Sequence, residues 1–385
     1  MTAILRLGLA VIVFCLSLLA VFHPPTYNGW KASIGVTELG HFLAMIAVLT
    51  WLPGWRRTAA GKVAAVLGFF AFMLALSPII RALAVATGLP DRLTAAFGAS
   101  QPRSLPGATP RARPFSIGGL VRKPSSPEVR MTTIPFVVRD GKPLELDFYK
   151  RDREMAPAPL VVMIYGGSWR SGVKEDLPAL NSYLASRGYA VAAVSYRFAP
   201  AHPFPAATDD VNAAIDYLKA NATRFGIDST RIVLIGRSAG GQLALLSAYT
   251  KNDSSIKGAV AFYPPTDQKW GWDNPTNQRV YDSFRTLREF MNGEPAAVPD
   301  AYRNSSPLNF VGPTTVPTLL IHGSLDPLVS VRQSARLDSA LTAARRPHLF
   351  IKMPWATHGC DYVFTGPCGQ ISTYAIERFL AGVVK

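Results

Sequence analysis

A serine inside a Gly-x-Ser-x-Gly pentapeptide is the first candidate for chemistry in this chain. Ser238 follows Gly236 and Arg237 and precedes Ala239 and Gly240, between the apolar runs RIVLIG and QLALLSAY. The pattern predicts a buried strand that meets a helix through a sharp turn, with the serine at the turn. The glycines fit because a strained serine backbone brings its flanking residues against neighbouring chain. We therefore predict that Ser238 is a nucleophile.

A serine hydroxyl is a weak nucleophile at neutral pH and needs a histidine base that a carboxylate holds in the correct tautomer. Asp326 follows the run VPTLLIHG, and His358 follows the run HLFIKM, so both groups come just after predicted strands. Each residue alone also has a structural explanation, as a turn aspartate or a loop histidine. The order Ser238, Asp326, His358 predicts a catalytic triad that attacks an acyl carbonyl.

A glycine-rich loop with the sequence YGGSW directly follows the apolar run that ends at Tyr165. Acyl transfer passes through an intermediate with a negatively charged oxygen, which backbone amides stabilise. We predict that the amides of Gly167, Ser168 and Ala239 form this oxyanion hole. A purely structural Gly-Gly turn is the alternative.

Several strands must end at one edge of a sheet for these residues to meet. After Met131, the runs IPFVV and LELDFY predict a hairpin, and later apolar runs separated by helical stretches predict a mostly parallel sheet flanked by helices. These later runs are PLVVMIY, YAVAAVSY, RIVLIG, KGAVAFY, VPTLLIHG and HLFIKM. The fold class is therefore α/β. The polar stretch 264–313 is expected to form a small cap.

Residues 131–385 resemble an α/β-hydrolase fold esterase of the hormone-sensitive-lipase and acetyl-esterase type. Besides the serine pentapeptide and the glycine loop, the stretch SYRFAPAHPFPAATDDV at 195–211 is similar to that family's YRLAP-x-HPFPA-x-x-D motif. The resemblance implies hydrolysis of short-chain acyl esters without a metal or an organic cofactor. It also implies the triad roles of Ser238, Asp326 and His358.

Three residues depart from the family pattern. Tyr165 replaces the usual loop histidine, Ser168 replaces the third glycine, and Arg237 replaces the acidic residue before the nucleophile. Arg237 could attract an anionic substrate or form a structural ion pair. The loop with Trp169 is also similar to that of arylformamidases and feruloyl-esterase-like hydrolases. Short- to medium-chain esters are the expected substrates, with an amidase or arylformamidase, or a non-catalytic binding protein of the same fold, as alternatives.

Two cysteines lie close to the predicted base. Cys360 and Cys368 flank the sequence DYVFTGP just after His358. A disulfide between them would stiffen this loop and imply an oxidising compartment, whereas two buried thiols are the alternative. Cys15 lies in an apolar N-terminal run and is interpreted as a lipid-facing residue.

The N-terminal 90 residues read as a membrane region with about three transmembrane helices, at about 4–22, 33–55 and 63–80. No small-x-small cleavage site follows Ala20, so a retained anchor is favoured over a signal peptide. In the second span, Glu38 and His41 are interpreted as interfacial, with helix packing, proton relay or ligand contact as alternatives. Residues 91–130, rich in Pro, Gly, Ser and Arg, are expected to be a linker.

The net charge of +15 is concentrated near the membrane region. About 13 of the 40 basic residues but only about 3 of the 25 acidic residues lie in positions 1–130. Basic residues beside apolar spans mark membrane topology, so the expected partners are a lipid bilayer and a small-molecule ester, and not nucleic acid. Arg56, Arg57 and Lys62 place the loop between the second and third spans in the cytoplasm. The catalytic domain is then expected on the exoplasmic or periplasmic side, with the cytoplasmic side as the alternative.

Overall fold

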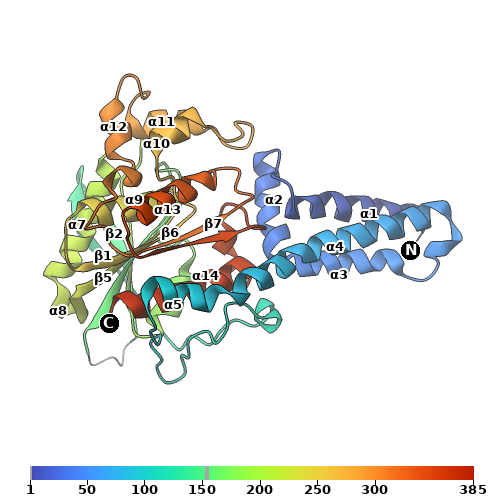
Figure 1. Cartoon of the computed structure of the whole chain (residues 1–385), viewed down its shortest axis with the longest axis horizontal. Coiled ribbons are helices and arrows are strands. Elements are labelled where there is room, and N and C mark those ends of the chain that lie inside the picture. Colours follow the sequence, from blue (N-terminus) through green and yellow to red (C-terminus); the bar gives the residue numbers. More distant parts are fainter. Residues whose placement is uncertain (1, 152–155) are drawn as a thin grey trace.

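A single mixed sheet organises the C-terminal part of the computed structural model, which describes residues 2–151 and 156–385. The described strands follow the order β1-β2-β4-β3-β5-β6-β7-β8 (Figure 1). β1 and β2 form the predicted antiparallel hairpin, β2 is antiparallel to β4, and the remaining pairs are parallel. The strands are β1 (Arg130–Arg139), β2 (Lys142–Lys150), β3 (Ala158–Ile164), β4 (Ala190–Val194), β5 (Ile227–Arg237), β6 (Ile256–Phe262), β7 (Thr318–Gly323) and β8 (His348–Met353). The predicted mostly parallel sheet is confirmed.

Helices cover both faces of this sheet, which explains why its central strands are apolar at successive positions. Leu160 and Val162 of β3 join the core on one face, whereas Val161 and Met163 join the core on the other. One core includes residues of α7 (Ala206–Ala220), α9 (Ala239–Thr250) and α13 (Arg332–Ala343); the other includes residues of α6 (Pro178–Ala185) and α14 (Pro367–Val383). A strand that is buried on both faces has no solvent-exposed side, so polar residues do not alternate with apolar ones along it.

The insertion between β6 and β7 is helical, in the stretch where the sequence predicted a cap. These helices gather together beyond α9 and α13 on one side of the sheet part (Figure 1). They are α10 (Gln268–Asp273), α11 (Ser283–Met291), α12 (Pro299–Asn304) and the short 3-10 turn η5 (Pro307–Phe310). Leu287 and Phe290 of α11 and Tyr302 of α12 pack into the hydrophobic core, which fixes the insertion in place.

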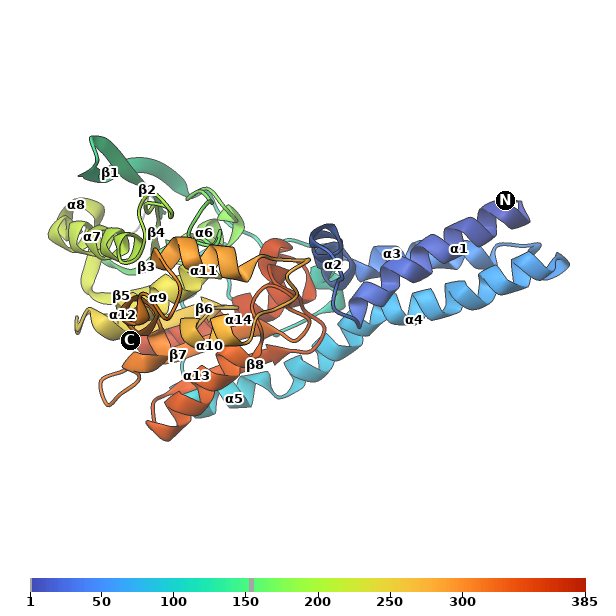
Figure 2. The same cartoon turned by 90° about the horizontal axis from the view of Figure 1, so that it is seen from above.

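The N-terminal helices form a bundle that projects away from the sheet part (Figure 2). Among the described residues, two helices are long and apolar enough to cross a membrane: α1 with its continuation (Ala3–Ala20) and α4 (Ala59–Thr87). Both expose large apolar side chains along their length, for example Ile4 (81%) and Ile12 (59%) on α1 and Val66 (55%) and Phe70 (52%) on α4. Such surfaces suit contact with lipid.

The predicted second span is bent rather than straight. α2 (Tyr27–Glu38) and the following helix, α3 (Gly40–Val48) with η2 (Leu49–Trp51), meet at an angle of 81° and count as a third span only if the bent pair is taken as one. Gly40 lies at the bend, where a Cβ atom would come within 2.3 Å of the Ala75 carbonyl oxygen. This glycine therefore lets α3 approach the backbone of α4 closely. α2 itself stands across the end of the bundle, against the sheet part (Figure 1).

The segment predicted as a linker lies against the sheet part. It begins with α5 (Leu89–Phe97), whose Leu93 is buried, and contains the 3-10 turn η4 (Ile117–Leu120). The backbone N–H of Arg111 donates to Glu377 Oε2 at 3.0 Å, and the guanidinium of Arg378 donates to the Arg111 carbonyl oxygen at 2.6 Å. These contacts hold the segment on α14, so it does not extend as a free tether.

Candidate active site

Ser238 sits on the sharp turn between β5 and α9. Its backbone has φ +53° and ψ −120°, a conformation that a non-glycine residue rarely adopts. Its N–H donates to the Phe262 carbonyl oxygen at 2.9 Å. A Cβ atom on Gly236 would lie 2.0 Å from the Gly240 carbonyl oxygen, and one on Gly240 would lie 2.2 Å from the Tyr165 carbonyl oxygen. Both glycines of the pentapeptide are therefore needed for the turn to pack.

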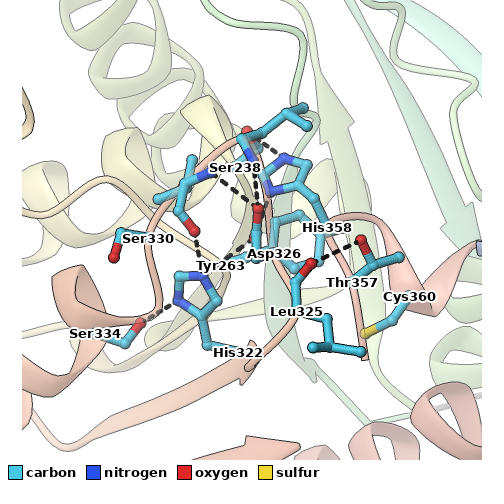
Figure 3. Close-up of polar contacts among 12 residues, drawn as sticks. Ser238, Tyr263, His322, Leu325, Asp326, Ser330, Ser334, Thr357, His358 and Cys360 are labelled. Atoms are coloured by element: carbon cyan, nitrogen blue, oxygen red, sulfur yellow. Dashed lines mark hydrogen bonds and ion pairs between the residues drawn. The ribbon is translucent and has the colours of Figure 1, made fainter. Parts of the chain in front are cut away.

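The structure brings Ser238, His358 and Asp326 together in one hydrogen-bonded series (Figure 3). His358 Nε2 lies 3.0 Å from Ser238 Oγ, and His358 Nδ1 lies 2.7 Å from Asp326 Oδ2. Asp326 Oδ1 accepts hydrogen bonds from the backbone N–H groups of Leu328 and Val329 at 2.8 and 2.9 Å. Asp326 comes from the loop after β7, and His358 comes from the loop after β8. Both lie at the carboxyl ends of parallel strands, as the sequence predicted.

Asp326 is held as a carboxylate although it is buried. Burial alone would raise its pKa, but the charge of His358 and hydrogen bonds from His322 and His358 outweigh that effect and hold the pKa well below its usual range. An ionised carboxylate beside Nδ1 favours the tautomer in which Nδ1 carries the proton. Nε2 is then free to accept the proton of Ser238.

A second histidine, His322, contacts the same carboxylate and was not among the predicted site residues. Its Nε2 lies 3.1 Å from Asp326 Oδ2 and 3.0 Å from the Val329 carbonyl oxygen, and its Nδ1 lies 2.8 Å from Ser334 Oγ. Because both neighbours of Nε2 are acceptors, Nε2 carries the proton and Nδ1 accepts from Ser334. The sequence signal was its place at the end of β7, four residues before Asp326.

The glycine-rich loop lies beside the nucleophile. Gly167 and Ser168 have positive φ values of +119° and +58°, and a Cβ atom on Gly167 would lie 2.0 Å from the Ser171 carbonyl oxygen. Both residues line the same groove as Ser238, and Ser168 and Ala239 line an inner cavity next to it. The residues predicted for the oxyanion hole therefore surround Ser238.

Trp169 fixes this loop to two other elements. Its indole Nε1 donates to Gln242 Oε1 of α9 at 2.8 Å, and its ring stacks on Phe290 of the cap with 4.0 Å between centroids. Tyr281, also in the cap, donates its hydroxyl proton to Ser168 Oγ at 2.8 Å. The cap thus contributes directly to the position of the loop.

The stretch 195–211, which carries the family motif, packs against the start of the glycine-rich loop. The ring of Tyr196 stacks on Tyr165 at 4.6 Å between centroids, and its hydroxyl donates to the Tyr165 carbonyl oxygen at 3.1 Å. Asp210 Oδ2 accepts from the backbone N–H and the Nε of Arg197 at 3.0 and 2.9 Å. Tyr165, which stands where the family has histidine, therefore serves in packing.

Arg237 forms a buried ion pair, which favours its structural interpretation. Its Nε donates to Asp361 Oδ2, and the hydroxyl of Tyr263 donates to Asp361 Oδ1 at 2.5 Å. The ring of Tyr263 also lies 4.3 Å from the ring of His358. Neither Tyr263 nor Asp361 lies in a motif that marks it in the sequence. Their signal is their place, one directly after β6 and the other three residues after the predicted base.

Replacing Asp361 by asparagine is expected to lower the free energy of unfolding by about 3 kcal/mol, because Arg237 would keep its buried charge without a charged partner. The full chain in detergent, unfolded by denaturant and followed by tryptophan fluorescence, gives this value. Asp273→Asn is the matched control, because its ion pair with Lys269 is exposed and should contribute at most about 1 kcal/mol. Equal effects of the two substitutions would contradict the prediction.

Cys360 and Cys368 form a disulfide, with 5.7 Å between their Cα atoms. The bridge closes the segment that follows His358 and begins with the 3-10 turn η6 (Cys360–Tyr362). Cys15 lies exposed on α1. Within residues 2–151 and 156–385, no group of three or more His, Cys, Asp or Glu side chains is placed to hold a metal ion.

Two spaces meet at Ser238. The inner cavity has a volume of about 60 Å³ and lies under the cap. Its lining combines apolar side chains, among them Trp169, Leu287 and Leu328, with hydroxyl and amide side chains. The outer groove has a volume of about 540 Å³ and a more polar lining, which includes Arg170, Asp176 and His358. Ser238 therefore borders both spaces.

This fold and the surroundings of Ser238 define an α/β hydrolase of the esterase type. Residues 146–341 match the family described as BD-FAE, and the chain belongs to that family. It is 31% identical over 253 residues to esterase LipC of Mycobacterium tuberculosis, covering 61% of each chain. It is 28% identical over 264 residues to the probable carboxylic ester hydrolase LipM of the same organism, covering 63% of this chain and 59% of the relative.

Among solved structures, a bacterial heroin esterase is similar to this chain with a TM-score of 0.60 and 25% identity, covering 70% of this chain and 89% of the other. The chain thus spans about 60% of the length of the two curated relatives, 61% and 59%, and most of the length of this structural neighbour.

Proposed function

We propose that this protein is a membrane-anchored serine esterase with Ser238, His358 and Asp326 as its triad. The observation that carries the proposal is the hydrogen-bonded series at the nucleophile turn, with 3.0 Å from Ser238 Oγ to His358 Nε2 and 2.7 Å from His358 Nδ1 to Asp326. The esterase names of the relatives agree with it.

In the proposed reaction, His358 Nε2 takes the proton of Ser238 as Oγ attacks the acyl carbonyl. The amides of Gly167, Ser168 and Ala239 stabilise the oxyanion. His358 then gives the proton to the leaving alcohol, and an acyl-enzyme remains. Water that loses a proton to the same Nε2 hydrolyses the acyl-enzyme, which restores Ser238. Asp326 stays ionised throughout and stabilises the imidazolium.

Labelling with a fluorophosphonate tests this function, because the probe phosphonylates only an activated serine. We expect the full chain in native membranes to be labelled, and mass spectrometry to place the adduct on Ser238. Heat-denatured protein is the control and should not be labelled. A folded protein that stays unlabelled, or an adduct on another serine, would overturn the proposal. Comparison of matched ester and anilide substrates then separates an esterase from an amidase.

The inner cavity is proposed to hold the acyl group. A volume of about 60 Å³ accommodates roughly four or five water-sized groups. This size supports short to medium acyl chains.

For p-nitrophenyl esters, kcat/KM is expected to fall at least about tenfold between butyrate and decanoate, since a chain longer than the cavity must displace packed side chains of the cap. Such overpacking costs about 1–3 kcal/mol, and about 1.4 kcal/mol corresponds to a tenfold change. Steady-state hydrolysis below the micellar concentration of each ester measures this. As a matched variant, Leu287→Ala of the cap enlarges the cavity and should favour the longer chain. A kcat/KM that rises steadily to decanoate would contradict the placement of the acyl group.

The membrane location is proposed from the apolar helices α1 and α4, and the exoplasmic or periplasmic side from two features. Arg56 and Arg57 end the short 3-10 turn η3 (Trp55–Arg57) just before α4, Lys62 lies in the first turn of α4, and positive loops tend to remain cytoplasmic. The disulfide Cys360–Cys368 suits an oxidising compartment. Alkaline phosphatase fused after Lys385 should be active, since this reporter needs export. If the phosphatase fusion is inactive and a cytoplasmic reporter fused at the same position is active, the catalytic domain lies on the cytoplasmic side instead.

A further inference from the structure

Helix α2 of the N-terminal region reaches the groove beside Ser238. Tyr27 and Trp30, one turn apart on this helix, line the groove together with Ser238 and His358. Their rings lie 5.2 Å apart at an angle of 54°. Tyr27 is 46% exposed and Trp30 is half-buried, so both rings have surface free to meet a ligand. α2 stands between the apolar bundle and the sheet part (Figure 1).

One face of α2 is fastened to the loop that carries His358. Trp30 Nε1 donates to the His358 carbonyl oxygen at 2.9 Å, and its ring lies edge-on to the imidazole at 6.2 Å. One turn later, Ile34 Cδ1 lies 3.4 Å from the point where a Cβ atom of Gly359 would stand. The helix and the base loop are therefore in contact over successive turns.

The last turn of α2 ends in a buried carboxyl group that completes the attachment. Glu38 Oε2 accepts from the backbone N–H of Cys368 at 2.9 Å, and Glu38 Oε1 accepts from Trp355 Nε1 at 3.3 Å. Residues 30, 34 and 38 are spaced by one helical turn, so they share one face. α2 is thus a fixed wall of the groove, and Glu38 is a junction residue rather than one that faces lipid.

The two substituents of an ester can be assigned to the two spaces at Ser238. The inner cavity of about 60 Å³ suits the acyl group, which leaves the groove of about 540 Å³ for the alcohol. Tyr27 and Trp30 bring aromatic faces to a groove whose other walls carry Arg170 and Asp176. Aromatic faces bind apolar rings and chains, whereas charged side chains bind polar groups.

We propose that Tyr27 and Trp30 determine specificity for the alcohol part of the substrate, which is a bulky amphiphilic alcohol whose apolar portion packs on these two rings. The inference rests on the proposed esterase function. The membrane region is then part of the active site as well as an anchor.

The test compares acetyl esters of two alcohols, ethanol and 1-naphthol, on the full chain in detergent. Ethyl acetate is too small to extend far along the groove, whereas the larger, aromatic naphthyl group is the one that the proposal expects to pack on the two rings. We expect Tyr27→Ala to lower kcat/KM for naphthyl acetate about tenfold, mainly through KM, and to change that for ethyl acetate less than twofold. Asn28→Ala, at an exposed position on the same turn, should change neither value.

Two variants of Trp30 separate its ring from its hydrogen bond. Trp30→Phe keeps an aromatic face and loses the donor to His358, so the ratio of the two kcat/KM values should stay within twofold of wild type. Trp30→Ala removes the face and should lower the ratio. If Tyr27→Ala lowers both substrates equally, or neither, the inference is overturned while the esterase function stands. A wild-type chain that hydrolyses neither ester overturns both.

Discussion

Replacing Ser238 by alanine is expected to lower kcat for p-nitrophenyl acetate by about 10⁶-fold, because without Oγ no acyl-enzyme can form. Residual hydrolysis above the rate in water would come from the amides around the carbonyl oxygen and from binding, which act without the nucleophile. KM should change far less than kcat, because the cavity and the groove stay intact. Steady-state kinetics on the full chain in detergent measure both values.

Ser339→Ala is the matched control for this substitution. Ser339 is exposed on α13, and its hydroxyl donates to the Ala335 carbonyl oxygen of the same helix, at 3.0 Å. This variant should keep wild-type kcat. Activity of the Ser238 variant within tenfold of wild type would show that another group carries the reaction.

Replacing Asp326 by asparagine is expected to lower kcat by about 10⁴-fold while the protein stays folded. The amide would place either a neutral oxygen or an N–H beside His358 Nδ1, so the imidazole is no longer held in the tautomer that accepts the Ser238 proton. His322 contacts the same oxygen of Asp326, so its own position should shift as well. Asp216→Asn, in an ion pair on the exposed side of α7, is the control.

The pH dependence of stability adds a second readout. In wild type, the pKa of Asp326 lies below its ordinary value, so the ionised carboxyl contributes to the free energy of unfolding above that ordinary value. The contribution should be lost progressively as the pH falls from the ordinary pKa of an aspartate through the lowered one. Asp326→Asn should lack this part of the acid dependence, which denaturant unfolding at a series of acidic pH values measures. The same acid dependence in both proteins would contradict an ionised Asp326.

The residues of the proposed triad could be predicted because each follows a strand whose apolar run is visible in the sequence. Ser238 also lies in a pentapeptide whose glycines are explained by lack of space, because added Cβ atoms would lie only 2.0 and 2.2 Å from backbone carbonyl oxygens. Tyr263 and His322 were missed for a different reason. They lie at strand ends too, but only the fold shows that one packs on His358 and the other shares Asp326.

The N-terminal region shows what hydropathy cannot predict. A helix bent by 81° at Gly40 has the same composition as a straight one, so the apolar pattern at 33–55 gave no sign of the bend. Glu38 was interpreted as an interfacial group at the start of that span, whereas it bonds Trp355 and Cys368 more than 300 positions later. A contact at such separation leaves no local pattern in the sequence.

Helix α4 does not end where the apolar bundle ends. Its Ala82 and Ala86, with Leu89 and Leu93 of α5, belong to the same hydrophobic core as α14 and β8. With 29 residues at about 1.5 Å each, α4 is roughly 44 Å long, about 14 Å more than the hydrocarbon core of a bilayer. In the proposed membrane, the extra length lets α4 continue as one helix from the lipid into the core of the sheet part, so the two parts are joined rigidly. Ser238 would then be held at one height and one tilt relative to the lipid surface, which sets the position at which an ester carried by the membrane must present its carbonyl.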